Sequence, residues 1–130
     1  DGHVEFDGCA VGFDLQASFQ ESSFTLDFRL GNKALVTITD DITDLSLQFP
    51  NTSGNFVLLI KQSISGSQTV ANYKVMNYLG NGATGSASLK FAGGSNPTLT
   101  TDANHVDIIS IFWDADNQIA YGVATLDFQF

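Results

Sequence analysis

Apolar and polar residues alternate with a period of two along most of this 130-residue chain. In the segment 11–19 every odd position is apolar, and Asp14, Gln16 and Ser18 lie between them. Successive side chains of a β-strand point to opposite faces of its sheet, so this pattern predicts a strand with one buried face. The alternation returns, and predicts further strands, at 24–30, 45–49, 69–76 and 87–91.

Two other segments predict strands by different signals. Gly31 and Asn32 form a tight-turn signal that leads into a strand at 35–39. Residues 56–60 are continuously apolar, which predicts a strand buried on both faces. No stretch of ten or more residues has the apolar spacing of a helix, and glycine and β-branched residues recur throughout. We therefore expect an all-β fold.

The last forty residues, 91–130, predict a β-hairpin. Their centre, Val106 to Trp113, is strongly apolar and follows a loop rich in Gly, Pro and Asn. The acidic turn Asp114–Asn117 comes next, and apolar positions then alternate to the last residue. With this hairpin the chain has about nine or ten strands at the short spacing typical of sandwiches. We predict a single antiparallel β-sandwich domain, jelly-roll-like, over residues 1–130.

The composition agrees with a folded domain whose surface carries few charged residues. The apolar fraction is 43%, which excludes disorder, and only 15% of residues are charged. The net charge of −9 and the five scattered Lys and Arg residues argue against nucleic-acid binding. A surface with so few charges leaves room for a large, partly apolar face, which would suit an oligomer.

Several further features limit the class of protein. No apolar run approaches the roughly 18 residues that a membrane helix needs, so we expect no membrane insertion. Cys9 is the single cysteine and predicts a small buried hydrophobe. The chain opens with Asp1 rather than Met, so we expect a processed product or a domain cut from a longer protein.

Metal binding is an alternative reading of three polar clusters. Asp114, Asp116 and Asn117 resemble the start of a calcium loop, although the glycine and the closing glutamate of that loop are missing, and a hairpin turn is favoured. Asp40, Asp41 and Asp44 form an acidic loop, for which a solvated loop is favoured over a cation site. His105 and Asp107, two positions apart, would share a strand face and could form a metal pair, but a surface histidine before a buried strand is favoured.

No catalytic residues and no cofactor are predicted. The loop GNGATG lacks the following helix and the Lys-Ser/Thr pair of a phosphate site, and no serine-nucleophile motif occurs. Two groups of exposed residues are candidates for binding instead. Tyr78, just before that loop, and Asn81, within it, are candidate glycan or receptor contacts. Trp113, Phe128 and Phe130 are candidate contacts at a subunit interface, because a terminal strand is an edge that needs covering.

From about Leu45 onward the chain resembles the C-terminal β-domain of tailed-bacteriophage virion proteins. Four segments carry the resemblance: NFVLLIKQ, SGSQTV, GGSNPTLTTDANHVDIISIFWD and the closing YGVATLDFQF. Residues 1–44 lie outside it and form either the companion half of the sandwich or an arm. The Trp-containing segment that precedes Gly-Gly in the family is replaced here by Lys90, Phe91 and Ala92.

The resemblance implies a homotrimeric β-sandwich on the virion surface, in a tail fibre, spike or head decoration. It implies assembly in the host cytoplasm, contact with other virion proteins, and no catalytic residues. We therefore expect a non-enzymatic virion structural protein. The alternatives are a module that binds host carbohydrate through Tyr78 and Asn81, and a calcium-stabilised adhesin domain.

Overall fold

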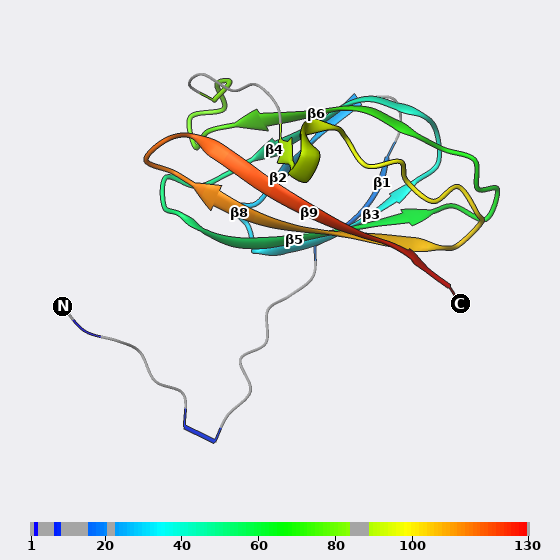
Figure 1. Ribbon diagram of the computed structural model, residues 1–130, viewed down its shortest axis with the longest axis horizontal. Coiled ribbons are helices and arrows are strands. Elements are labelled where there is room, and N and C mark those ends of the chain that lie inside the picture. The colour runs from blue at the N-terminus through cyan, green and yellow to red at the C-terminus, as the bar shows by residue number, and fades with distance from the viewer. Residues whose placement is uncertain (1, 3–6, 9–15, 21–22, 84–88, 130) are drawn as a thin grey trace.

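A computed structural model describes residues 2, 7–8, 16–20, 23–83 and 89–129, whose regular secondary structure is almost entirely β (Figure 1). Two sheets contain the strands, one of order β1-β3-β5-β8-β9-β7 and one of order β2-β4-β6. The strands are β1 (Gln16–Gln20), β2 (Ser23–Asp27), β3 (Lys33–Ile38), β4 (Ile42–Gln48), β5 (Gly54–Gln62), β6 (Val70–Met76), β7 (Lys90–Phe91), β8 (Val106–Asp114) and β9 (Ile119–Phe128). The expectation of an all-β fold is confirmed.

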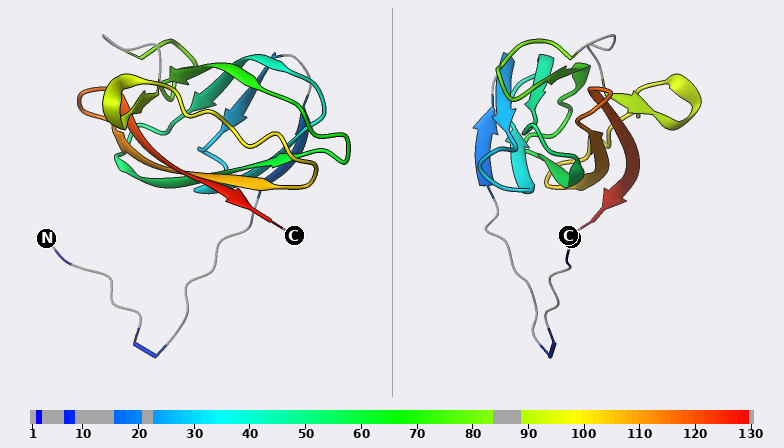
Figure 2. Two further views of the ribbon diagram at one scale, coloured as in Figure 1. Left: turned by 45° about the vertical axis from the view of Figure 1, so that its right-hand side comes forward. Right: turned by 90° about the vertical axis from the view of Figure 1, so that its left-hand side faces the viewer.

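The first six strands pass alternately between the two layers, which Figure 2 shows from two further sides. Each strand therefore lies beside the strand two places further along the chain, and the pairs β1–β3, β3–β5, β2–β4 and β4–β6 are all parallel. The prediction of an antiparallel sheet is wrong for this half of the chain. The short turns, such as the one at 28–32, carry the chain across to the opposite sheet instead of back along the same one.

The predicted hairpin of β8 and β9 is confirmed. The two strands pair antiparallel from Asp114 opposite Ile119 to Val106 opposite Phe128, and β8 also pairs antiparallel with β5. A bulge interrupts the β8–β9 register between Val106 and Ile108. β7 adds a short parallel edge beside β9 and leads into the 3₁₀ turn η1 (Ala92–Gly94). No helix among the described residues is long and apolar enough to cross a membrane.

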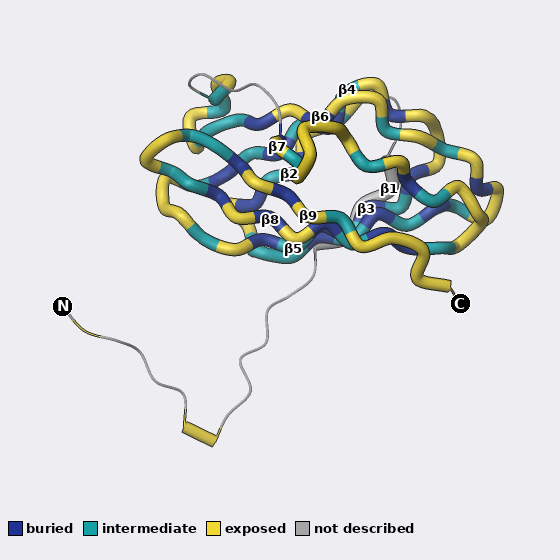
Figure 3. Tube along the Cα trace, viewed as in Figure 1, coloured by how far each residue is buried: buried dark blue, intermediate teal, exposed yellow. Residues whose placement is uncertain are grey.

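Both sheets contribute to one core, and buried positions alternate with less buried ones along its strands (Figure 3). In β3, for example, Ala34, Val36 and Ile38 are fully buried. An aromatic cluster lies at one part of this core, where Phe49 stacks on Phe28 and on Trp113 and also meets Phe56 edge-on. Burying one such side chain contributes about 1.5–3 kcal/mol, so the shared core holds the layers together.

One strand is less buried than its sequence predicts. Phe56, Leu58 and Ile60 of β5 are buried, but Val57 and Leu59 between them are only half-buried. The prediction that this strand is buried on both faces is therefore wrong for the single chain. Its second face belongs to the outside of the six-stranded sheet.

Candidate functional site

The outside of the six-stranded sheet is the candidate functional surface. We call it the outer face and define it by the side chains that alternate with buried core residues on β3, β5, β8 and β9. These residues are Lys33, Leu35, Thr37, Asn55, Val57, Leu59, Lys61, Ile108, Ser110, Phe112, Asp114, Ile119, Tyr121, Val123 and Thr125. They come from segments that are up to ninety positions apart in the chain, so the sheet assembles this surface.

The strand registers bring the apolar members of the outer face into contact range. Leu35 lies opposite Leu59, and Leu59 lies opposite Ile108. Phe112 lies opposite Tyr121 on the neighbouring strand. Directly paired side chains on one face have Cβ atoms about 4.5–5.5 Å apart, so these rows form a continuous apolar surface.

This surface is exposed in the single chain. The exposed fractions are 47% for Phe112, 48% for Tyr121 and 61% for Val123. A shallow hollow of about 390 Å³ lies among these three residues, Asn55 and Val57. A smaller hollow of about 210 Å³ continues past Val123 to Phe91, Ala92, Ser95 and Pro97. Apolar patches of this kind mark contact sites on soluble proteins.

The charge of the outer face differs from that of the whole chain. The chain has fourteen acidic residues and a net charge of −9, yet the outer face has a single acid, Asp114 at the end of β8. Its other charged members are Lys33 and Lys61. Depletion of charge together with exposed aromatic rings is the composition found at the centre of protein–protein interfaces.

The structure separates the three aromatic residues that the sequence assigned to a subunit interface. Phe128, near the end of β9, is 43% exposed and remains a candidate contact, and Leu126 beside it is 40% exposed. Phe130 lies outside the described residues. Trp113 is fully buried, and its Nε1 donates a hydrogen bond of 2.8 Å to the Pro50 carbonyl oxygen. Its assignment to an interface is therefore wrong, since the domain's own core surrounds the ring.

The candidate glycan contacts lie on another part of the molecule, in the loop that follows β6 of the smaller sheet. Tyr78 is 42% exposed, and Asn81 is exposed as well. The Asn77 side chain accepts hydrogen bonds from the backbone N–H groups of Leu79 and Asn81, and Arg29 donates to the Tyr78 carbonyl oxygen. This loop is fixed and accessible, and its contact with a glycan stays a prediction.

Acids of both clusters have partners within the chain. Asp114 accepts hydrogen bonds from the backbone N–H and the side-chain amide of Asn117, which lower the pKa of its carboxyl. This confirms the preference for a hairpin turn at 114–117. Asp41 accepts from the backbone and hydroxyl of Thr69, and Asp44 forms an ion pair of 3.2 Å with Lys74 on β6.

His105 and Asp107 do not face each other. His105 lies in the turn before β8, and its Nδ1 is 2.6 Å from Oδ1 of Asp127. Asp107 points inward and is 2% exposed, and it accepts hydrogen bonds from the backbone and hydroxyl of Thr100 and from the backbone of Asp127. The disfavoured alternative of a metal pair at these two residues is therefore wrong, because His105 precedes the strand, where the period of two does not apply.

The partner that sequence reasoning missed is Asp127, because only the pairing of β8 with β9 places it beside His105. Among the described residues, Asp102, His105 and Asp127 form a group that offers three ligand atoms within 4.8 Å of one another. A comparison with protein-family models, curated proteins and solved structures finds no match to this chain.

Proposed function

We propose that this chain is a non-enzymatic assembly domain that associates with copies of itself through the outer face. The observation that carries the proposal is the combination of exposed apolar side chains and a single acid, Asp114, on this face, in a chain of net charge −9. Apolar area removed from water contributes about 25 cal/mol per Å², so covering this face would favour association.

The continuous apolar run of β5 supports the same conclusion. Val57 and Leu59 are residue types found in strands that are covered on both sides, but the single chain covers only one side. A second copy would supply the missing cover. The depletion of acids makes a contact between like-charged copies feasible, because the one carboxylate, that of Asp114, already accepts hydrogen bonds from Asn117.

The proposed assembly is a homotrimer of β-sandwich domains on a bacteriophage virion surface, in a tail fibre, spike or head decoration. Support for the trimer and for the virion comes from the resemblance of residues 45–130 to phage β-domains. Three copies around a threefold axis could each turn the outer face inward, so that both neighbours cover it. Other virion proteins would then contact the remaining surface.

Size-exclusion chromatography with light scattering tests this proposal. At micromolar concentration we expect a mass of three times 13.9 kDa. The double variant Phe112→Ser/Val123→Ser removes exposed apolar area from the outer face without opening the core, and it should elute as a monomer.

The matched control is Ile64→Ser/Leu79→Ser, which removes two apolar side chains that are 84% and 65% exposed outside the outer face. This control should keep the wild-type mass. A wild-type protein that stays monomeric at micromolar concentration would overturn the proposal, and so would a trimer that the outer-face variant leaves intact.

A further inference from the structure

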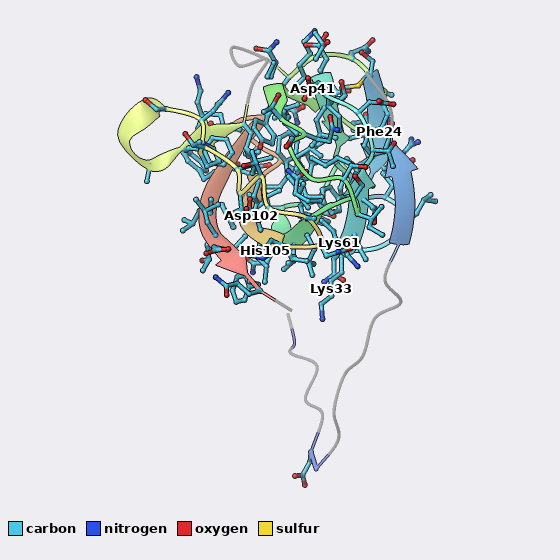
Figure 4. The ribbon with its side chains drawn as sticks, turned by 90° about the vertical axis from the view of Figure 1, so that its right-hand side faces the viewer. Phe24, Lys33, Asp41, Lys61, Asp102 and His105 are labelled. Carbon is cyan, nitrogen blue, oxygen red and sulfur yellow. The ribbon has the colours of Figure 1, made fainter. Side chains whose placement is uncertain are left out.

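Asp102, His105 and Asp127 meet at the end of the molecule where β9 finishes. Figure 4 labels Asp102 and His105, which lie close together there. Asp102 belongs to the turn before β8, His105 ends that turn, and Asp127 comes from the far end of the hairpin. The imidazole nitrogen and one oxygen of each carboxylate all lie within 4.8 Å of one another.

The backbone fixes all three positions. The His105 N–H donates to the Asp102 carbonyl oxygen at 3.2 Å, and the His105 carbonyl oxygen accepts from Gln62 of β5 at 2.9 Å. The Asp127 N–H donates at 2.9 Å to the buried carboxylate of Asp107, which also holds Thr100. The group is therefore preorganised by neighbours that are themselves in the core or the sheet.

This donor set has a definite preference among cations. Calcium takes six to eight oxygen ligands, so an imidazole with two carboxylates suits it poorly. Zinc binds His nitrogen and Asp oxygen at about 2.0–2.2 Å, in tetrahedral sites that often combine three protein ligands with one water. Other first-row divalent ions accept the same ligands with affinities that follow the Irving–Williams order.

We propose that Asp102, His105 and Asp127 form a binding site for a divalent transition-metal ion, with Zn²⁺ as the preferred ion and water as the fourth ligand. The ion takes the place of the hydrogen atom between His105 Nδ1 and Asp127 Oδ1, and the neutral imidazole carries its one proton on Nε2, the ring nitrogen that does not bind the ion. These two atoms, now 2.6 Å apart, then separate to about 3.3 Å, the spacing of two ligands on a tetrahedral zinc ion.

The site would join the turn before β8 to the end of β9. Without the ion, these two parts are connected through the end of the β8–β9 hairpin, where the bulge interrupts the pairing. Asp102 and His105 belong to the turn, and Asp127 lies one residue before the exposed Phe128. An ion bound only by the folded state raises its stability by mass action. The ion would therefore fasten the end of β9 to the body of the domain.

The test uses the full chain carrying His3→Gln and Cys9→Ser, because these residues are the other nitrogen and sulfur ligands outside the site. After EDTA treatment and dialysis, ZnCl₂ is titrated by calorimetry and melting is followed with and without Zn²⁺. CoCl₂ replaces Zn²⁺ for absorption spectra, since tetrahedral Co²⁺ has strong visible bands. We expect one ion per chain, a melting temperature raised by about 5 °C at saturating Zn²⁺, and tetrahedral Co²⁺ bands.

Two variants and one control test whether His105 and Asp127 bind the ion. In this background, His105→Gln and Asp127→Asn should each weaken Zn²⁺ binding at least about tenfold and abolish the Co²⁺ bands. Asn is suitable at position 127 because it tolerates the backbone φ of 65° there. Asp116→Asn, a matched change of an exposed acid in the hairpin turn, should bind as the parent does. No Zn²⁺ binding by the parent, or unchanged binding by His105→Gln and Asp127→Asn, would overturn the proposal.

Discussion

Tyr73 buries a hydroxyl group in the core between the two sheets. Its side chain is 1% exposed, its ring meets Phe91 edge-on, and its hydroxyl makes no hydrogen bond to a described residue. Burial is the main cause that raises its pKa above the ordinary value, and the charge of Asp107 adds to the shift. The neutral hydroxyl is therefore strongly preferred in the folded state.

From the raised pKa of Tyr73 we predict that the free energy of unfolding falls at alkaline pH. The unfolded tyrosine ionises near pH 10, while folded Tyr73 keeps its proton, so the free energy of unfolding should fall as pH rises above about 10. Tyr73→Phe removes this group and should flatten that part of the profile. At neutral pH the variant should be as stable as wild type or more stable, because an unpaired buried hydroxyl costs free energy. Urea unfolding across pH checks this; an equally steep alkaline loss in Tyr73→Phe would contradict it.

The burial of Trp113 could have been predicted from the sequence, but its contacts could not. Its position beside a turn suggested a subunit contact, but Ile109, Ile111 and Trp113 share the same parity along one strand. The two isoleucines are buried, and the period of two places the tryptophan on their side of the sheet. The signal for its burial was therefore present in the sequence. Its partners Phe49 and Pro50 were not predictable, because they come from a strand and loop of the first half of the chain.

At the scale of elements, Gly66 allows two loops to pack backbone against backbone. It has a φ of 64°, and a Cβ atom built on it would lie 2.5 Å from the Thr101 carbonyl oxygen and 2.9 Å from the Ala103 nitrogen. The adjacent Ser67 N–H donates to that same Thr101 oxygen at 2.6 Å. The turn between β5 and β6 is therefore fitted closely against the turn before β8.

We expect Gly66→Ala to lower the free energy of unfolding by about 3 kcal/mol or more, because a backbone cannot move aside as a side chain can. Gly93→Ala is the matched control, since Gly93 also has a positive φ but no atom within 4 Å of the added Cβ. It should cost only about 1–2 kcal/mol, the penalty of the left-handed conformation itself. Urea denaturation of both variants measures these losses of unfolding free energy. Equal losses would contradict the prediction, because they would mean that the positive φ alone, and not the close backbone contact, sets the cost.

The pairing of some strands was predictable from the sequence, and the pairing of others was not. The β8–β9 hairpin was predictable because Asp114 to Asn117 is a short turn of residues that favour reversal, and the strands on either side are neighbours in sequence. The parallel pairing of β1 to β6 was not. Alternation tells which side chains of β2 and β3 are buried, but a turn such as 28–32 does not reveal whether the chain stays in its sheet or crosses to the other.

At the scale of the whole molecule, charge and apolar area are segregated. The apolar outer face results from the pairing of β3, β5, β8 and β9 in one register, and no local pattern predicts that arrangement. Composition did indicate that so few charges leave room for such a face. Composition could not indicate that Asp114 is the single acid among its residues, because which side chains share a face depends on how the strands pair.

This segregation predicts how salt acts on the proposed self-association. Each copy brings a net charge of −9, so copies repel each other at long range while the apolar side chains of the outer face hold them together. The screening length falls from about 30 Å at 0.01 M salt to about 8 Å at 0.15 M, so added NaCl should reduce the repulsion and strengthen association. Sedimentation velocity at both concentrations, over a dilution series, measures this. Phe112→Ser/Val123→Ser should remain monomeric at both. Association of the wild type that weakens as salt rises would mean that ion pairs, and not apolar contact, hold the copies together.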